Sequence, residues 1–566
     1  MTSYCRPFAS ISYLVPIACL LGFTAVFGAS IIQGDGQFDQ SLSILIARSI
    51  AASCFAAILF FLLNSLIIGF KSQSRYTDRR HNIVERLTPK LTPKSIMIAT
   101  TVMLLLWLPW IIALYPASMN WDTYYQMWMW YPESHPLLQI PWSPTQSFID
   151  SAFTDHHPIF DTIVYGAFAL VSDMLTGSWN AGVFIFAAMQ TIGTATALVC
   201  GIAYAHERGC PPPACFISLL FCSIMPFFPA YSMTMLKDSF FSWLFLPWIV
   251  ILAEICYTKG EILRSKKFAF WLILLTILLC LTKKTGFYVV LFTILVFTIV
   301  FRRHWKPLAL AGISAILLMQ VILPSFIFTA LDVAPGGKQE MLAPLFQQTA
   351  RYAVFHGNDI TEEERSTIDA VLGYDTLADR YDPFTADPVK NGYNWQDGDK
   401  HIRDYLLAWI NMGVRHPLTY LEATLATNAP YISPVGSLEI HEDTGDIEHG
   451  GSDMLKRPTR LDGFRNTMIS AYHNSEELPL FGTLFQVVLY AWWIPLFWLY
   501  SSIYQKSEYL PLIAVLFISI ASCLITPVFH ARYALPLIYA TPFFVCLLLT
   551  KCLNHTSSQN DPERTQ

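Results

Sequence analysis

Short polar stretches rich in acids and histidines interrupt a chain that is otherwise strongly apolar. The stretch "TDHHPIFD" places Asp155, His156 and His157 directly before an apolar run that itself contains Asp161. An earlier stretch, "YPASMNWDTYYQ", places Asp122 about one turn after another apolar run. Carboxylates and imidazoles at such positions can transfer protons or bind a metal ion. A solvated loop with an aromatic interface belt would contain the same residue types. The scarcity of basic partners, and the acid in the returning helix, favour a functional site.

Cations appear later in the chain, at three other junctions between polar and apolar sequence. They lie in "MTMLKDSFFSWLF", "LTKKTGFY" and "PVFHARYALP". A local ion pair at a helix end is the simplest interpretation of the first. Ammonium and guanidinium groups on one side of a membrane also suit the binding of a phosphate. The candidates are Lys237, Asp238, Lys283, Lys284, His530 and Arg532.

The composition excludes a soluble enzyme with a single anchor. Hydrophobic residues make up 54% of the 566 residues and charged residues only 14%, whereas soluble proteins carry about a quarter charged residues. The net charge of −5 says little, because the charges are segregated along the chain. The twelve cysteines are scattered and give no disulfide pattern. Cys210 and Cys215 flank three prolines, but the sequence shows no further partners for a zinc site.

Basic loops predict the orientation of the chain. Seven Lys or Arg residues lie in 71–94, four in 259–267 and three in 302–306. Short loops rich in Lys and Arg stay in the cytoplasm. The first outer loop, 116–157, and the segment 330–477 should then both face the outside.

One stretch leaves the number of crossings open. The chain must cross an even number of times between the outer loop and Asp238, yet three apolar runs are present, including the short runs 158–175 and 214–236. Pro226 and Pro229 interrupt the second of these runs. Two short half-helices in this run would make the number of crossings even. Broken helices at membrane depth are tolerated where protein surrounds them.

The fold class expected is an all-α polytopic membrane protein with about 12–14 transmembrane helices and a mostly helical extracytoplasmic domain. The acidic segment 330–477, which holds 24 of the 41 Asp and Glu residues, supplies that domain. The expected parts are two N-terminal transmembrane helices with a basic cytoplasmic loop in 1–94, a transmembrane core in 95–329, the outer domain in 330–477, C-terminal transmembrane helices in 478–551 and a cytoplasmic tail in 552–566.

The order of these motifs resembles the GT-C superfamily of integral-membrane glycosyltransferases. The similarity rests on an Asp just after the first helix of the core, a second Asp before His-Pro, a Lys-Asp pair opening a later span and a late Arg-Tyr-x-x-Pro loop. It covers roughly residues 100–550. A largely uncharacterised group from Gram-positive bacteria looks similar in "FQQTARYAV", "ITEEE", "YDPFTADPVK" and "RHPLTYLEA". Lys283 and Lys284 stand where such chains often have Arg, and two extra helices precede residue 95.

The resemblance implies a GT-C-like core and a hexosyl- or pentosyltransferase of the cell membrane, with its active site outside. The donor would be a sugar on a polyprenyl phosphate, and the acceptor a cell-envelope glycan, lipid or protein; no nucleic acid is implied. Asp122 and Asp155 would be the catalytic carboxylates. A divalent cation, Mg²⁺ or Mn²⁺, held by Asp122, Asp155 and His156 is an open alternative. The substrate-binding residues would be His156, His157, Lys237, Asp238, Lys283, Lys284, Arg351, His530 and Arg532.

Two other functions compete with this interpretation. A transporter or a lipid or oligosaccharide flippase would carry charged residues near the middle of the membrane and internal repeats. The charges here lie at the outer ends of the apolar runs, and no repeat is visible in the sequence. A scaffold for cell-wall assembly is the third alternative.

Overall fold

The computed structural model describes residues 6–73, 82–131, 153–441 and 454–550, and these are almost entirely helical. Eight helices in this part of the chain are long and apolar enough to cross a membrane. The all-α polytopic membrane fold is therefore confirmed. The eight segments are Ser12–Gln33, Leu42–Lys71, Pro93–Ala113, Ile159–Thr176, Asn180–Glu207, Lys237–Tyr257, Arg302–Leu331 and Ala531–Leu549, and three shorter apolar segments are Pro212–Ile224, Lys284–Val300 and Leu510–Leu524.

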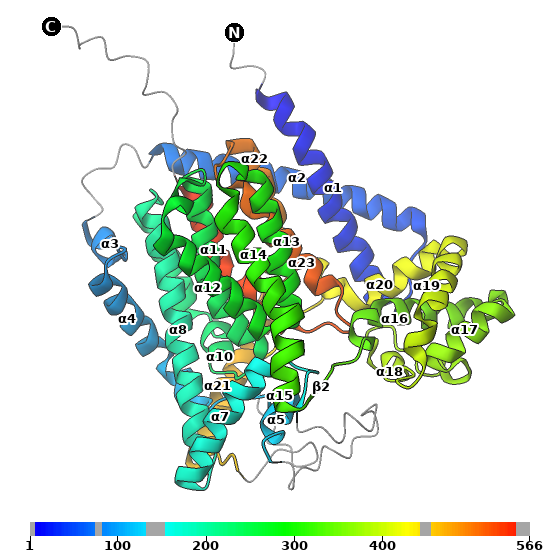
Figure 1. Ribbon diagram of the computed structural model, residues 1–566. Coiled ribbons are helices and arrows are strands. Elements are labelled where there is room, and N and C mark those ends of the chain that lie inside the picture. Colours follow the sequence, from blue (N-terminus) through cyan, green and yellow to red (C-terminus); the bar gives the residue numbers. More distant parts are fainter. Residues whose placement is uncertain (1–5, 74–81, 132–152, 442–453, 551–566) are drawn as a thin grey trace.

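Figure 1 labels the elements for which there is room, and their full order along the chain is as follows. The first half of the chain forms α1 (Arg6–Gln33), α2 (Leu42–Gln73), α3 (Asn82–Leu87), α4 (Pro93–Ala113), α5 (Trp121–Trp128), β1 (Phe153–Thr154), α7 (Ile159–Thr176), α8 (Asn180–Glu207), α9 (Pro212–Ile224), α10 (Phe227–Ser232), α11 (Lys237–Tyr257), η3 (Glu261–Arg264), α12 (Lys266–Thr282), α13 (Lys284–Val300), η4 (Arg302–His304), α14 (Trp305–Leu317), η5 (Leu318–Phe328), α15 (Thr329–Leu331) and β2 (Val333–Ala334). The second half forms α16 (Gln339–His356), η6 (Gly357–Asp359), α17 (Glu362–Leu372), η7 (Tyr374–Thr376), α18 (Asp387–Lys390), α19 (Gly398–Arg415), α20 (Pro417–Ile432), η9 (Thr459–Leu461), α21 (Asp462–Glu477), η10 (Gly482–Phe485), η11 (Leu489–Trp493), α22 (Ile494–Gln505), η12 (Leu510–Leu512), α23 (Ile513–Leu524), η13 (Ala531–Ala534) and α24 (Leu535–Leu549).

Alternating helices bring distant residues to one end of the bundle. α11 begins at Lys237, α12 returns to end beside Lys283, and α13 leaves again from Lys284. α14, η5 and α15 then return to the same end, where β2 follows. Each turn at this end therefore contributes polar residues to the same region, which is called the site end below.

The basic loops lie at the opposite end, called the basic end. His304 forms an ion pair with Glu261 at 3.4 Å, so η3 and η4 lie together. The backbone N–H of Leu91 donates to Glu207 at the end of α8. Thr88 of the same segment donates to the carbonyl of Pro212. Residues 74–81 of the first basic loop lie outside the described residues.

After His157 the chain forms a helical hairpin at the site end before it runs to the basic end. α7 starts at the site end and finishes at a turn where Trp179 donates its backbone N–H to Met454. α8 then returns past the site, where Gln190 donates to the carbonyls of Ser232 and Thr234, and continues to the basic end. α7 and the first turns of α8 thus form a hairpin on the site side, although α7 has the length and hydropathy of a candidate span.

The way back from the basic end is the broken helix that the prolines predict. α9 ends at Ile224, and α10 begins after Pro226 and contains Pro229. The predicted break into two half-helices is therefore present, between α9 and α10.

Residues 339–432 form a small helical domain beside the bundle, with a separate core. Buried side chains from α16, α17, α19 and α20, among them Phe346, Ile368 and Tyr405, make up this core. α21 does not belong to it: Arg465 donates to the carbonyl of Ala113 at the end of α4. The predicted outer segment 330–477 therefore divides between the domain and the bundle.

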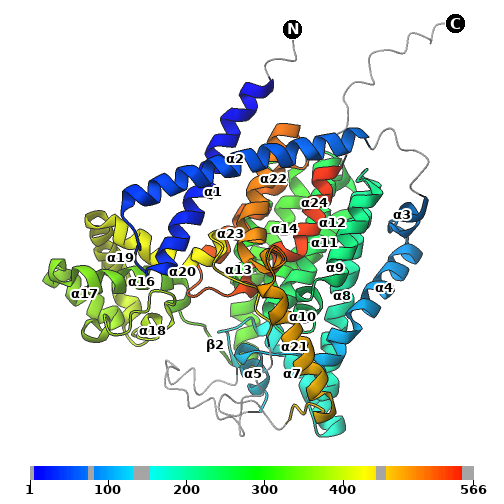
Figure 2. The same cartoon turned by 180° about the vertical axis from the view of Figure 1, so that it is seen from behind.

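The C-terminal part 478–551 does not begin with one long continuous helix, because η10 and the π-helical η11 precede α22. α2 runs crosswise over the bundle in Figures 1 and 2, whereas α8 and α11 run along its length. Residues 132–152 of the first outer loop and the tail 552–566 lie outside the described residues.

Candidate functional site

Short stretches of backbone pairing hold the loops of the site end together. Ser118 pairs in parallel with Thr234, which places α5 beside the start of α11. β1 pairs in parallel with β2, and the N–H of Asp155 donates to Ala334. Thr385 of the small domain pairs with Val528, just before the loop that carries Arg532. These pairings join segments that lie far apart in the sequence.

Asp122 is the centre of the charged site. Its Oδ2 accepts hydrogen bonds from Lys237 Nζ at 3.1 Å and from a terminal nitrogen of Arg532 at 3.2 Å. His157 Nε2 lies 3.8 Å from its Oδ1. The position of Asp122 is fixed locally, because Asn120 caps α5 and Asp122 follows in the first turn. A carboxylate that accepts two charge-assisted hydrogen bonds is strongly held.

The surroundings of Asp122 keep it ionised. Burial alone would raise the pKa of this carboxyl, but the positive charges of Lys237 and Arg532 outweigh burial and hold the pKa well below its usual value. Asp122 is therefore an ionised carboxylate and a weak base. It becomes a better base only when its cations acquire another anionic partner.

A second carboxylate lies beside the first and uses the same guanidinium. Lys283 Nζ lies 2.7 Å from Oδ1 of Asp238, and Arg532 Nε lies 3.6 Å from its Oδ2. Asp238 is fully buried. Asp122, Asp238, Lys237, Lys283 and Arg532 are called the ion-pair network below. Three cations and two carboxylates leave one positive charge in excess.

Asp155 belongs to a separate pair at the edge of the network. Its Oδ2 accepts a hydrogen bond from Lys284 at 2.8 Å, and the same ammonium contacts its carbonyl oxygen. Burial raises the pKa of Asp155 more than Lys284 lowers it. Gly336 closes over this pair, since a Cβ there would lie 2.5 Å from the carbonyl oxygen of Asp155.

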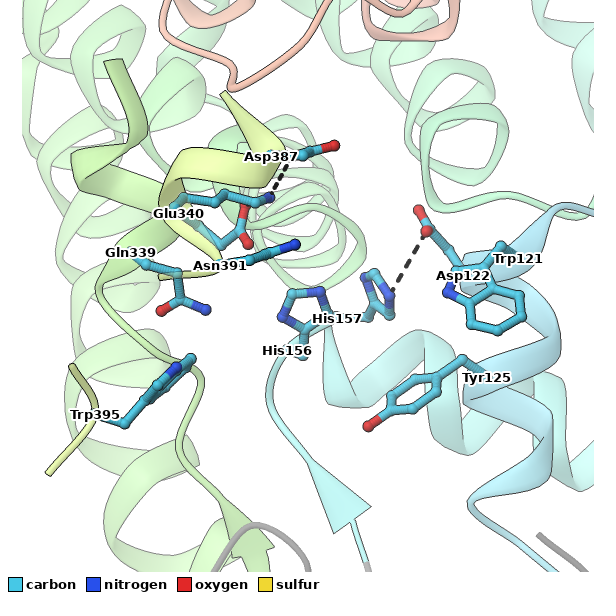
Figure 3. A pocket seen from close by; sticks show the side chains of 11 residues that line it. Trp121, Asp122, Tyr125, His156, His157, Gln339, Glu340, Asp387, Asn391 and Trp395 are labelled. Carbon is cyan, nitrogen blue, oxygen red and sulfur yellow. Dashed lines mark hydrogen bonds and ion pairs between the residues drawn. The ribbon is translucent and has the colours of Figure 1, made fainter. Parts of the chain in front are cut away.

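The two adjacent histidines point to different sides. Figure 3 shows His157 turned toward Asp122 and His156 turned toward Gln339 and Glu340. Lys237 Nζ donates to Nδ1 of His157 at 3.0 Å, which requires an unprotonated Nδ1 and leaves the proton on Nε2. Burial lowers the pKa of both imidazoles, for His156 to about 4. Both rings are therefore neutral near pH 7.

A cavity of about 240 Å³ lies beside the network, between α5 and the small domain. Figure 3 shows Asp122 on one wall and Trp395 and Glu340 on the other. Lys390 pairs with Glu340 at 2.7 Å and with Asp387 at 2.8 Å. The cavity is lined by Trp121, Asp122, Tyr125, His156, His157, Gln339, Glu340, Asp387, Lys390, Asn391 and Trp395.

Sequence reasoning did not assign the lining from the small domain. The motif "YDPFTADPVK" contains Asp387 and Lys390 and was the available signal. Nothing in the sequence pairs it with the first outer loop. In the structure, the backbone N–H of Ala386 donates a hydrogen bond to the carbonyl of Pro527, which joins this motif to the loop before Arg532.

Most of the predicted site residues come together, but Arg351 does not. Its guanidinium is buried in the small domain, where it pairs with Glu422 at 2.6 Å and donates to Tyr381. His530 lies at the site end, where its backbone N–H and carbonyl both bond Tyr431. Burial lowers the pKa of its imidazole to about 4.

The proposed metal ligands Asp122, Asp155 and His156 do not form a shared set of ligands within the described residues. Their two carboxylates are turned toward different cations, Asp122 toward Arg532 and Asp155 toward Lys284. The described residues do contain one group of three metal-ligand side chains close together, but it consists of cysteines elsewhere.

Asp161 lies beneath the network in the first turn of α7. It is fully buried, and within the described residues neither of its carboxylate oxygens has a hydrogen-bond partner. A buried acid without a hydrogen-bond partner is costly and calls for a structural or functional explanation.

One family model matches residues 9–564, and its description is "Family of unknown function (DUF6020)". The chain belongs to the DUF6020 family. No curated protein and no solved structure matches the chain. In this DUF6020 chain, the ion-pair network and the cavity beside it are therefore the features that bear on function.

Proposed function

We propose that this protein is a membrane glycosyltransferase. It would move a sugar from a polyprenyl-phosphate-linked donor to a cell-envelope acceptor at the outer face of the cell membrane. The motifs that resemble the GT-C superfamily support this proposal, and so does the arrangement of charges at the site end.

The observation that carries the proposal is the excess of positive charge in a largely buried network. Lys237 and Arg532 hold Asp122, while Lys283 and Arg532 hold Asp238. Buried cations that exceed their carboxylates are stabilised by a further anion. A phosphodiester or phosphomonoester at the membrane boundary supplies that charge, and guanidinium and ammonium groups are its usual partners.

The adjoining cavity supports a sugar as the second part of the ligand. Trp121, Tyr125 and Trp395 offer flat apolar faces, and Gln339 and Asn391 offer amide groups. Its volume of about 240 Å³ is below the roughly 300–1,000 Å³ of sites for drug-sized ligands. A single sugar ring fits this description better than a large ligand.

The reaction follows from these positions. A hydroxyl oxygen of the acceptor forms a bond to the anomeric carbon, while the bond from that carbon to the phosphate oxygen breaks. The bonding pair leaves with the polyprenyl phosphate, whose new charge Lys283, Lys237 and Arg532 stabilise. The proton of the acceptor hydroxyl passes to Asp122.

Asp122 is the better candidate for the base because it lines the cavity, whereas Asp155 does not. A donor phosphate would draw Lys237 and Arg532 away from Asp122 and so raise its pKa toward a useful value. Asp155, fixed by Lys284, would position the turn that carries His156 and His157.

The test is turnover by the purified full-length protein reconstituted in lipid. Polyprenyl-phosphate hexoses and pentoses are supplied with and without a cell-envelope fraction, and release of polyprenyl phosphate is measured. Asp122→Asn should lose about 10²–10⁴-fold in rate. The matched control is Glu363→Gln, which removes an exposed carboxylate of α17 and should keep full activity.

Two outcomes would contradict the proposal. Equal turnover by Asp122→Asn and wild type would remove Asp122 from the chemistry. Transport of the intact donor across the bilayer of proteoliposomes, without cleavage of the sugar–phosphate bond, would identify a flippase instead.

A further inference from the structure

Three buried thiols meet at the basic end, far from the ion-pair network. Their sulfur atoms, from Cys210, Cys215 and Cys546, all lie within 4.8 Å of one another. The three residues are at most 2% exposed. The thiol of Cys546 also lies 3.2 Å from the hydroxyl of Ser218. The sequence left Cys210 and Cys215 without partners, and the fold supplies one from the last helix.

The local backbone holds the first two thiols in place. Cys210 ends the turn after α8, and its N–H donates to Ala205. Three prolines follow, and Cys215 lies in the first turns of α9. Proline fixes the backbone dihedral φ, so the Cys-x4-Cys loop has little freedom to lose on binding a ligand. This spacing is within the range of structural metal sites.

We propose that these three cysteines bind a thiophilic metal ion, with Zn²⁺ as the natural candidate. A metal–sulfur distance of about 2.3 Å places sulfur atoms roughly 4 Å apart, so small side-chain shifts suffice. Free buried cysteines usually act as small apolar residues, but that role does not require three thiols from one turn and two helices to meet. In the proposed orientation the cluster faces the reducing cytoplasm, where grouped cysteines bind metals more often than they form disulfides.

The bound ion would fasten α24 to the turn between α8 and α9. α24 begins at the loop of Arg532, so the ion would stabilise one of the helices that position the site. The expected gain is in stability, and the ion plays no part in the transfer reaction.

The test measures metal content and unfolding temperature of the full-length protein. Protein purified without chelators is incubated with Zn²⁺, desalted and analysed by elemental mass spectrometry. Wild type should retain about one equivalent, and Cys215→Ser and Cys546→Ser should each retain far less. Cys280→Ser is the matched control, because Cys280 is equally buried but lies in α12.

A spectroscopic readout keeps the proposal testable if a variant folds poorly. Co²⁺ or Cd²⁺ bound to wild type should show thiolate charge-transfer absorption in the ultraviolet, and Cys280→Ser should show the same. Wild type without retained Zn²⁺, or with retention that Cys215→Ser leaves unchanged, would overturn the proposal.

A second, independent feature is an exposed apolar face on the small domain. Leu407, Ile410 and Val414 follow one another along α19 at helical spacing, and Leu418 and Leu421 continue the face on α20. Val414 is 77% exposed and Leu418 63%. A contiguous apolar surface of this kind marks a binding face.

The placement of these helices indicates what covers the face. α20 packs against the last turns of α1, where Ser433 donates to the carbonyl of Ala25 and Ile31 contacts Ala429. α1 is a candidate span, so α20 lies near the height at which α1 leaves the membrane. Figures 1 and 2 show α19 and α20 as the layer of the domain nearest α2, with α18 on the far side.

We infer that this face lies in the outer surface of the lipid bilayer and anchors the small domain beside the site. Amphipathic helices bury their apolar side at the boundary between headgroups and acyl chains. Such an anchor would keep the cavity wall that carries Trp395 and Lys390 close to the membrane from which the lipid donor arrives.

Fluorescence quenching by brominated lipids tests this inference in nanodiscs. A fluorophore attached to Val414→Cys, in a background without reactive native thiols, should be quenched strongly. The control position is Lys400→Cys, on the polar first turns of α19. Equal quenching at the two positions would overturn the inference. A disulfide crosslink between Val414→Cys residues of two copies would also overturn it, because the face would then bind a second copy of the protein.

Discussion

Asp122 should compete with the donor phosphate for the same cations. Its Oδ2 accepts hydrogen bonds from both Lys237 and Arg532, which are also the groups proposed to hold the phosphate. Asp122→Asn keeps the shape of the side chain and removes its charge. The variant should therefore bind a polyprenyl phosphate more tightly than wild type, although it transfers the sugar far more slowly.

The size of the effect follows from the geometry. Lys237 Nζ lies 3.1 Å from Asp122. If a phosphate oxygen lies at a similar distance on the other side of this ammonium, the two anions are about 6 Å apart. At an effective dielectric constant of about 20, unit charges about 6 Å apart repel by about 3 kcal/mol. Loss of this repulsion corresponds to a gain in affinity of up to about 100-fold. Residual hydration of the site reduces it, so a gain of roughly 10- to 100-fold is expected.

Binding of farnesyl phosphate to detergent-purified protein measures the effect. Wild type, Asp122→Asn and the control Glu363→Gln are titrated at fixed salt concentration, and thermal unfolding establishes that each variant is folded. Glu363→Gln should match wild type. A folded Asp122→Asn with affinity ten-fold weaker than wild type would refute the reasoning, because the phosphate would then not share the cations of Asp122.

Three further predictions concern the orientation, the histidines and the edge pair. In intact cells, a membrane-impermeant maleimide should label Lys400→Cys but label Arg264→Cys only after permeabilisation; the reverse pattern would invert the topology. His156 has a pKa of about 4 in the folded protein instead of 6.5, so the unfolded state takes up its proton first as pH falls. The neutral His156 therefore contributes at most about 3 kcal/mol to the free energy of unfolding. This contribution is present above pH 6.5 and is lost as the pH falls to 4. The free energy of unfolding of His156→Gln should therefore depend less steeply on pH than that of wild type. Lys284→Met leaves the half-buried Asp155 without its cation, which should lower the unfolding temperature. Asp155→Asn combined with Lys284→Met should recover part of the loss; no recovery would mean that the two side chains are not coupled.

The sequence placed most of the candidate residues correctly at one end of the bundle. Alternating apolar runs and basic loops determine which helix ends share a side, and this logic brought Lys237, Lys283 and Arg532 to the end that carries Asp122. The prolines of 214–236 likewise predicted the break between α9 and α10. These features depend on local pattern, and local pattern is visible in a sequence.

Pairings within the site could not be predicted in the same way. Asp122 and Arg532 are 410 residues apart, and no local signal joins them. Lys283 and Lys284 are adjacent candidates for phosphate binding, and Lys283 has an extended backbone between two helices. Successive side chains of extended backbone point to opposite sides. Lys283 accordingly pairs with Asp238, and Lys284 pairs with Asp155.

Composition also identified apolar helices without giving their direction. α2 has the length and hydropathy of a span, yet it crosses over the bundle. α7 qualifies by the same criteria, but both of its ends lie on the site side. The direction of a helix depends on its contacts with neighbouring segments. One such contact is the hydrogen bond from the backbone N–H of Trp179 to the carbonyl of Met454, which only the folded chain shows.

A structure of the full-length protein with a bound polyprenyl-phosphate sugar would test the central claim most directly. The account predicts that the phosphate lies within hydrogen-bonding distance of Arg532 and of at least one of Lys237 and Lys283. It also predicts that the sugar lies in the cavity between Asp122 and Trp395, with Asp122 facing the anomeric carbon. A phosphate bound away from these cations, while Asp122 stays paired with Lys237 and Arg532, would contradict the account.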